Sequence, residues 1–194
     1  MDAIPGEPTP SSLRGDLLGL VLSRGYERRE QAFALSSGGS SHDYVDLRRA
    51  VSRGWDLSLA ARAVAAGLEG AGVAFDAIGG MTMGADPVAH AVALLNGCSW
   101  FSVRKAPKEH GTARRIEGAE LSAGRRVVVF EDTVSTGRSL VEALEVVSAT
   151  PSEIVGVCTM LDRGEHLSSR LEELGLTVPY VRVLTYEDLG IEPL

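Results

Sequence analysis

The stretch Arg126-Val127-Val128-Val129-Phe130-Glu131-Asp132-Thr133-Val134-Ser135-Thr136-Gly137-Arg138-Ser139-Leu140 decides the fold. It opens with four apolar residues, three of them β-branched, which predict a strand buried on both faces of a parallel sheet. Two acids follow at once, where such a strand would reach the carboxyl edge of its sheet. A short turn of hydroxyl residues and glycine comes next. An amphipathic run from Leu140 then predicts a helix.

This order of strand, acids, small turn and helix suits a phosphorylated sugar. Backbone N–H groups of the Thr133–Gly137 turn and of the following helix N-terminus favour an anionic phosphate. Glu131 and Asp132 are acceptors of hydrogen bonds when ionised, which is what ribose hydroxyls need. The alternative is an ordinary strand-to-helix turn in which the two acids only cap the helix.

Length and composition predict one domain with a substantial core. The chain has 194 residues, of which 44% are hydrophobic, and its net charge of −7 argues against a nucleic-acid partner. No apolar run approaches the ~20 residues of a membrane span. Met1–Ser12 lacks the basic and apolar regions of a secretory signal. We therefore expect a cytoplasmic protein with Cys98 and Cys158 as buried free thiols.

The segment from Arg104 to Arg115 is strongly cationic. Both lysines of the chain, Lys105 and Lys108, lie in it, while every other basic residue besides histidine is arginine. A compact ammonium and a planar guanidinium grip polyanions differently, so lysine at these positions indicates a chemical role. Without apolar periodicity, the segment predicts a mobile cationic loop near 104–115. The alternative is a merely solvated surface loop.

Strand and helix patterns alternate along the chain, which predicts an α/β fold with a parallel sheet. Strands are expected at 33–35, 44–47, 77–80, 99–103, 126–130, 154–161 and 181–184, and helices at 12–25, 55–68, 87–95, 140–147 and 167–174. Residues 186–189 predict a last helical turn. Ligands of such sheets lie beyond the carboxyl ends of the strands. Four candidate segments fall there and predict one composite site: Thr82–Asp86, Arg104–Gly111, Glu131–Gly137 and Asp162–Arg163.

The organising stretch closely resembles the phosphoribosyl-pyrophosphate (PRPP) motif of the type I phosphoribosyltransferases. Arg-Lys-x-x-Lys-x-His-Gly at 104–111 is similar to the loop motif of the orotate members of that family. The resemblance runs from Phe33 to Leu189. It also includes Phe33–Gly38 with Tyr44 and Asp46, Gly80–Pro87, and Asp162-Arg163.

The resemblance implies the type I phosphoribosyltransferase fold: a central parallel sheet flanked by helices, forming a single domain over 1–194. Residues 1–50 would form an N-terminal helix and a small hood, and 51–194 the α/β core. The implied reaction is Mg²⁺-dependent transfer of the phosphoribosyl group from PRPP to orotate, giving orotidine 5′-monophosphate and pyrophosphate in pyrimidine synthesis. The resemblance further implies a homodimer with shared active sites, in which Lys105 acts largely on the partner's site.

The resemblance also assigns residues. Lys105 and Asp132 would be catalytic, with Mg²⁺ held mainly by PRPP, near Asp132, and not by a protein metal site. Orotate contacts would come from Ser135 and Arg163. PRPP contacts would come from Arg104, Lys105, Lys108, His110, Glu131, Asp132, Thr133, Val134, Ser135, Thr136, Gly137, Arg138 and Ser139.

Two positions depart from the pattern of many members, because Ser36 and Met83 stand where lysines are common. Because these two lysines are missing, a phosphoribosyltransferase for another pyrimidine-like base is an alternative. A non-catalytic PRPP-binding regulator is a further alternative. Against it, only about 30 residues precede the first motif and the net charge does not suit DNA. A regulator would also have no need of a clamp with two lysines and a histidine.

Overall fold

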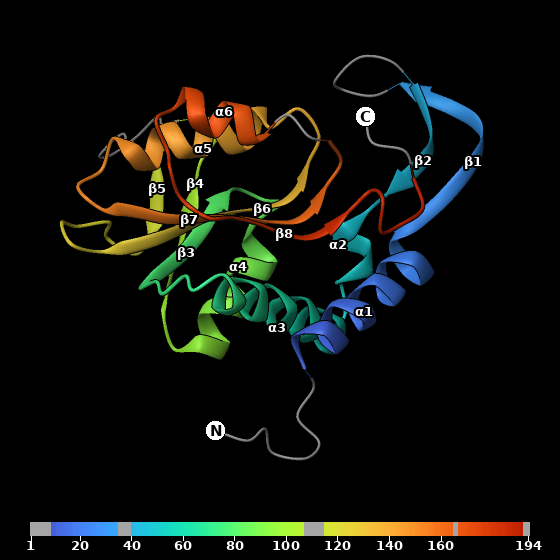
Figure 1. Ribbon diagram of the computed structural model, residues 1–194, viewed down its shortest axis with the longest axis horizontal. Helices are drawn as coiled ribbons and strands as arrows, with labels where there is room; N and C mark the ends of the chain where they lie inside the picture. The colour runs from blue at the N-terminus through green and yellow to red at the C-terminus, as the bar shows by residue number, and fades with distance from the viewer. Residues whose placement is uncertain (1–8, 35–39, 107–114, 165–166, 192–194) are drawn as a thin grey trace.

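The computed structural model describes residues 9–34, 40–106, 115–164 and 167–191 (Figure 1). Its centre is a six-stranded sheet in the order β5-β4-β3-β6-β7-β8. The strands are β3 (Ala77–Met81), β4 (Ser99–Val103), β5 (Ile116–Gly118), β6 (Arg126–Val134), β7 (Glu153–Asp162) and β8 (Tyr180–Thr185). All neighbours pair in parallel except β4 and β5, which are antiparallel. The expected α/β fold is confirmed.

Strand β6 is buried on both faces, as its apolar run predicts. Val127 and Val129 pack into one hydrophobic cluster, and Val128 and Phe130 into another, and all four are fully buried. Alternate residues of a strand point to opposite faces, so one strand supplies both halves of the core. Each such side chain contributes about 1.5–3 kcal/mol through removal from water.

Helices cover both faces of the sheet (Figure 1). On one face lie α1 (Pro10–Leu20), α3 (Gly54–Gly70) and α4 (Asp86–Asn96), whose buried residues share the cluster of Val128 and Phe130. On the other lie α5 (Arg138–Ser148) and α6 (Leu167–Glu173), which share the cluster of Val127 and Val129. The π-helical turn η1 (Val21–Gly25) extends α1.

A separate two-stranded sheet stands beside the core, beyond β8 in Figure 1. It consists of β1 (Tyr26–Ala34) and β2 (Ser40–Val45), and the short α2 (Leu47–Ala50) follows it. The guanidinium of Arg29 lies 4.2 Å from the ring centroid of Tyr44 and 5.2 Å from that of Phe33. The hairpin lies within residues 1–50, where the hood is expected, and its role as a hood stays a prediction. Ser36, Ser37 and Gly38 of its motif lie outside the described residues.

Several expectations need correction. Strand β1 begins at Tyr26 rather than at Phe33, and β6 continues through the two acids to Val134. Strand β5 was not expected, and residues 186–189 form turns rather than a helical turn. Both cysteines are free, but only Cys158 is buried, while Cys98 is half-buried.

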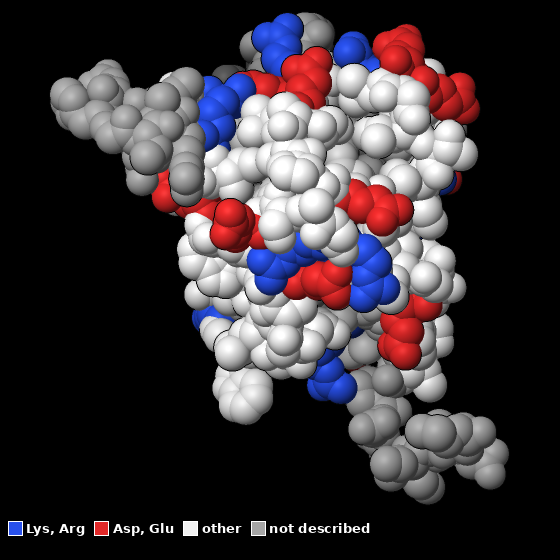
Figure 2. All heavy atoms as spheres, turned by 90° about the vertical axis from the view of Figure 1, so that its left-hand side faces the viewer, with Lys and Arg blue, Asp and Glu red and all other residues white. Residues whose placement is uncertain are grey.

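Acidic and basic side chains are interspersed on the face shown in Figure 2, and this face has no continuous basic area. Within the described ranges, no helix is both long enough and apolar enough to cross a bilayer.

Candidate active site

The described parts of the four candidate segments meet at one edge of the sheet, as expected. The chain passes from β3 to β4 on one side and from β6 to β7 on the other, so a crevice opens beyond the carboxyl ends of β3 and β6. A pocket of about 400 Å³ lies there. It is lined by residues from all four segments and from the β2–α2 region: Tyr44, Val45, Asp46, Leu47, Arg48, Met81, Thr82, Met83, Gly84, Lys105, Glu131, Asp132, Thr133, Ser135, Ser139 and Arg163.

The acid pair lies inside strand β6 and reaches this pocket. Glu131 is 7% exposed, and its Oε2 is buried with no hydrogen-bonding partner in the described part of the chain. Burial raises the pKa of Glu131 to about 9, with a further contribution from Asp132, while the Lys105 ammonium acts against the rise. Burial also raises the pKa of Asp132, although the Thr133 N–H donates to Asp132 Oδ1 over 2.9 Å.

The loop after β3 lies against the acid pair. A Cβ placed on Gly84 would stand 2.6 Å from Asp132 Oδ1, so a larger residue at position 84 would displace this carboxylate. Asp86 holds the loop to β4: its Oδ2 accepts from Thr82 Oγ1 over 2.6 Å, and its Oδ1 from Ser102 Oγ over 2.7 Å. Asp86 therefore shapes the loop in addition to standing in the first turn of α4.

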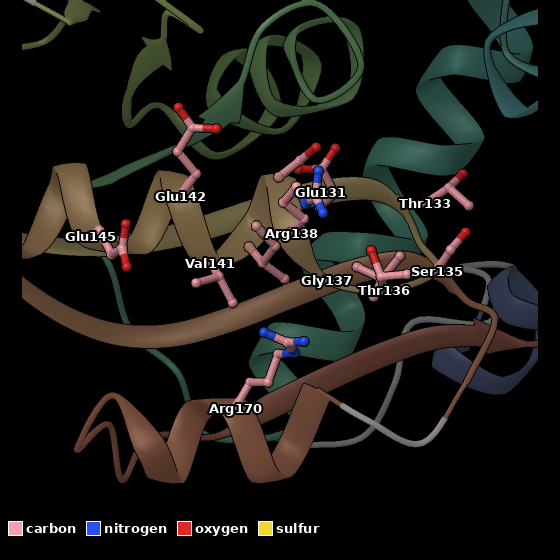
Figure 3. Close-up of a pocket in the computed structure, with 13 residues that line it drawn as sticks. Glu131, Thr133, Ser135, Thr136, Gly137, Arg138, Val141, Glu142, Glu145 and Arg170 are labelled. Carbon is pink, nitrogen blue, oxygen red and sulfur yellow. The ribbon is translucent and has the colours of Figure 1, made fainter. Parts of the chain in front are cut away.

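The phosphate turn is shorter than expected. It comprises Ser135–Gly137, because Thr133 and Val134 still belong to β6 and the Val134 side chain is in the core. Gly137 has φ +74° and precedes α5, whose N-terminus has no side-chain cap. The N–H groups of that first turn are thus available to an anion. Figure 3 shows the adjoining pocket of about 730 Å³, which Thr136, Arg138 and Ser139 also line.

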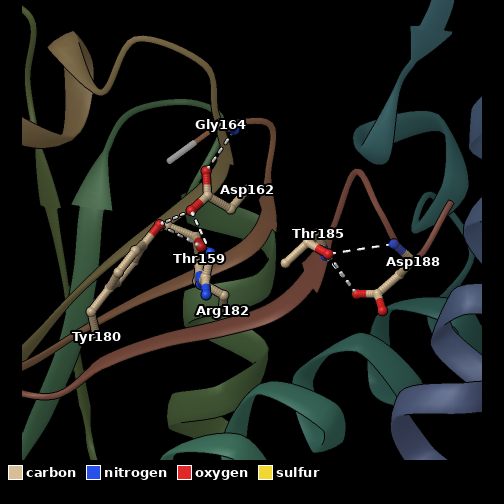
Figure 4. A network of polar contacts seen from close by, with 7 residues as sticks. All are labelled: Thr159, Asp162, Gly164, Tyr180, Arg182, Thr185 and Asp188. Atoms are coloured by element: carbon tan, nitrogen blue, oxygen red, sulfur yellow. Dashed lines mark hydrogen bonds and ion pairs between the residues drawn. The ribbon is translucent and has the colours of Figure 1, made fainter. Parts of the chain in front are cut away.

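Arg163 follows β7 and has donors to offer. Its Nε and Nη2 are buried and have no hydrogen-bonding partner among the described residues, while its guanidinium lies 4.8 Å from the ring centroid of Tyr186. The neighbouring Asp162 is occupied elsewhere: it accepts from Tyr180 Oη over 2.9 Å and from Gly164 N over 3.1 Å (Figure 4). The polar network fixes the strand end and leaves the guanidinium of Arg163 for the pocket.

The cationic segment enters the pocket through Lys105. Lys105 lines the pocket of its own chain, next to the acids that were expected to receive a partner's lysine. Arg104 is directed elsewhere, because its Nη1 lies 3.6 Å from Glu117 Oε1 on β5. Lys108 and His110 lie outside the described residues.

Several lining residues of the two pockets had no part in the sequence-based assignment, among them Glu145 and three other charged residues. Arg48 of α2 lines the smaller pocket, and Glu142 of α5 and Arg170 of α6 line the larger one. In Figure 3 Arg170 points from α6 toward the turn at Gly137. No sequence signal distinguishes Glu142 and Arg170 from other charged helix residues. Arg48 could have been noticed two positions after Asp46.

Comparison with known proteins agrees with this geometry. The phosphoribosyl transferase domain family matches residues 58–173, more than half of the chain. An orotate phosphoribosyltransferase of Streptomyces coelicolor is 39% identical over 190 residues, covering 94% of this chain and 100% of that protein. The chain belongs to the orotate phosphoribosyltransferase family.

Solved structures of orotate phosphoribosyltransferases have the same fold as this chain. The Mycobacterium tuberculosis enzyme in complex with Fe(III) dicitrate has a TM-score of 0.76 and 37% identity, covering 92% of this chain and 99% of that one. The same enzyme in complex with PRPP has a TM-score of 0.72 and 36% identity over the same shares. Met83, the residue that departs from the expected lysine, lines the pocket and is 67% exposed.

Proposed function

We propose that this chain transfers the phosphoribosyl group of PRPP to orotate, forming orotidine 5′-monophosphate and pyrophosphate in pyrimidine synthesis. The observation that carries the proposal is the guanidinium of Arg163 in the same pocket as the acid pair, where two of its buried nitrogens have no hydrogen-bonding partner among the described residues. A guanidinium fork binds a flat carboxylate through two parallel hydrogen bonds, and orotate bears such a carboxylate.

The other parts of the pocket match the remaining groups of PRPP. Glu131 and Asp132 would receive the ribose hydroxyls, and the turn Ser135–Gly137 with the N-terminus of α5 would bind the 5′-phosphate. In the reaction the C1′–O bond to pyrophosphate breaks, a ring nitrogen of orotate bonds to C1′, and that nitrogen loses its proton. Lys105 would stabilise negative charge as it develops on the pyrophosphate.

The two carboxyl groups at one wall, of which Glu131 would lose its proton beside the cation, also fit a magnesium ion carried in with the substrate. Mg²⁺ prefers several oxygen ligands, and Glu131 Oε2, beside Asp132, is a buried oxygen that no described residue hydrogen-bonds. Among the described residues no group of three or more potential side-chain ligands occurs, so PRPP oxygens and water would supply most of the coordination. When bound, the ion would neutralise charge on the pyrophosphate.

We further propose a cytoplasmic homodimer whose two sites are shared. Lys105 lines the pocket of its own chain, so we assign the sharing to the part of the cationic segment beyond it, with Lys108 and His110. Those residues complete the proposed PRPP contacts, and Arg104 would join them by exchanging its ion pair with Glu117 for the polyanion. A positively charged segment without an apolar anchor needs a polyanion and a neighbouring wall in order to close.

The test is a steady-state assay that follows the loss of orotate absorbance in the presence of PRPP and Mg²⁺. We expect turnover that requires all three components. Met83 at the pocket favours one further comparison, in which other pyrimidine carboxylates compete with orotate. Turnover of another base but not of orotate would replace the proposed substrate, and PRPP binding without any turnover would favour a regulator.

A further inference from the structure

Arg115, where the cationic segment returns to the sheet, bonds to the residues where that segment leaves it. Its Nε donates to the Arg104 carbonyl over 3.0 Å, and its Nη2 to the same carbonyl over 2.8 Å and to the Lys105 carbonyl over 3.2 Å. The Arg104 N–H in turn donates to the Arg115 carbonyl over 2.7 Å. The Arg115 side chain thus holds both peptide groups that flank the Lys105 Cα: the one that joins Arg104 to Lys105 and the one that joins Lys105 to Ala106.

Glu142 holds this guanidinium from helix α5. Arg115 Nη2 donates to Glu142 Oε1, and both side chains are partly buried, with exposed fractions of 26% and 40%. Glu142 lies about one turn after the start of α5, which begins at the phosphate turn, and lines the pocket next to that turn. Arg115 therefore links the base of the cationic segment to the helix that would bind the 5′-phosphate.

Lys105 is the residue that this link can affect. Its side chain lines the pocket of the acid pair, and its charge opposes the rise in the pKa of Glu131. A lysine side chain has four rotatable carbon–carbon or carbon–nitrogen torsions beyond its Cα, so its reach is defined only if its backbone is fixed. Hydrogen bonds from a forked guanidinium to consecutive carbonyls provide that fixation.

We propose that Arg115 and Glu142 are positioning residues that hold Lys105 against the acid pair and align it with the phosphate turn. The inference rests on the proposed activity and on the role proposed there for Lys105. Neither Arg115 nor Glu142 needs to touch the substrate, because both act through the backbone at Lys105.

Kinetics of Arg115→Lys and Glu142→Gln test the inference. Lysine keeps the charge but lacks the fork, and glutamine keeps the shape of Glu142 but loses the charge. Each variant should lower kcat about tenfold, as expected for the loss of a charge-assisted hydrogen bond, with a smaller change in the KM for orotate. Thermal unfolding of each should remain close to wild type. Glu120→Gln is the control, because Glu120 is an exposed acid after β5 whose loss changes the net charge equally.

The decisive measurement repeats Arg115→Lys in a Lys105→Ala background. If Arg115 acts through Lys105, the second substitution should change kcat by less than about twofold, because coupled residues are not additive. A full tenfold loss in both backgrounds would overturn the inference and leave Arg115 with a general structural role. Wild-type kcat in Arg115→Lys and Glu142→Gln would overturn it as well.

The outcomes separate this inference from the proposed function. Active wild-type protein with a slow Lys105→Ala variant and unaffected Arg115 and Glu142 variants would refute the positioning role alone. Wild-type rates in Lys105→Ala would overturn the role proposed for Lys105 and the inference together. Wild-type protein without turnover of orotate would instead refute the proposed activity.

Discussion

Gly84 and Asp132 approach so closely that a Cβ at position 84 would stand 2.6 Å from Asp132 Oδ1. Gly84→Ala should therefore displace the carboxylate and lower kcat/KM for PRPP by at least about tenfold, with little change in the unfolding temperature. Gly15→Ala is the matched control, because Gly15 lies in α1 with no atom within 4 Å of its would-be Cβ. It should leave kinetics unchanged and stabilise the helix by about 1 kcal/mol. Normal kinetics in Gly84→Ala would show that the carboxylate tolerates displacement.

Asp132→Asn should lower kcat/KM for PRPP on the order of 100-fold, the usual effect of removing one electrostatic contact in an active site. An amide would replace a charged acceptor at the wall where the ribose hydroxyls and the magnesium ion would bind. Initial rates at varied PRPP and Mg²⁺ measure the effect. Unchanged constants for both would remove Asp132 from the proposed ribose site.

Glu131 should make the folded protein less stable as the pH rises. Its folded-state pKa of about 9 lies above the ordinary value of 4.5, so between these values the folded state holds a proton that the unfolded state has lost. Relative to Glu131→Gln, the wild type should lose up to about 1.4 kcal/mol per pH unit within that window. Urea unfolding at several pH values measures the difference, with Glu120→Gln as the exposed control. A pH-independent difference would mean that Glu131 is ionised in the fold.

Arg163→Ala should raise the KM for orotate about 10- to 100-fold and leave the KM for PRPP within about threefold, because it removes charged hydrogen bonds to the base carboxylate. Arg182→Ala is the control, since this neighbouring guanidinium lies 3.9 Å from Asp162 Oδ2 instead. If both Michaelis constants rose equally in Arg163→Ala, Arg163 would have a structural role at the end of β7.

Mixed dimers should reveal the shared site. Lys108→Ala and Asp132→Asn proteins, each expected to be strongly impaired alone, should recover up to about a quarter of wild-type turnover after subunit exchange, because hybrids contain one intact site. Lys105→Ala mixed with Asp132→Asn should recover none, because Lys105 lines the pocket of its own chain. Recovery only in the second mixture would reverse this assignment and restore the arrangement expected from the sequence. Recovery in neither, after verified exchange, would mean that the sites are not shared.

Local patterns predicted most of the central sheet. Residues 127–130 are buried on both faces of the sheet, so their apolar composition alone was sufficient to predict a central strand. By contrast, β5 is only three residues long and exists through its pairing with β4, which local sequence does not encode. Strand β1 contains Glu27, Arg28, Arg29 and Glu30, whose polar side chains hide the strand pattern because the hairpin lies outside the core.

The candidate site was predictable where charged residues directly follow an apolar run, as at Glu131 and Asp132 within β6 and at Arg163 after β7. Contacts between distant segments were not predictable. Arg115 was one of six basic residues in its segment, and its bonds to Lys105 O and Glu142 depend on how β5 and α5 lie. Burial also separates side chain from backbone: the Val134 side chain packs in the core, so the PRPP contact expected of Val134 would come from its backbone.

The antiparallel pairing of β4 with β5 has a consequence for sequence change. The Arg104 N–H donates to the Arg115 carbonyl over 2.7 Å. The two ends of the connection between β4 and β5 are therefore held together at the same edge of the sheet. Closing a flexible connection costs only about 0.6 kcal/mol more for each doubling of its length. Insertions and deletions within 107–114 should consequently be tolerated by the fold while altering the local concentration of its cations at the pocket. Pairing through this short strand would allow the cationic segment to vary in length independently of the domain that carries it.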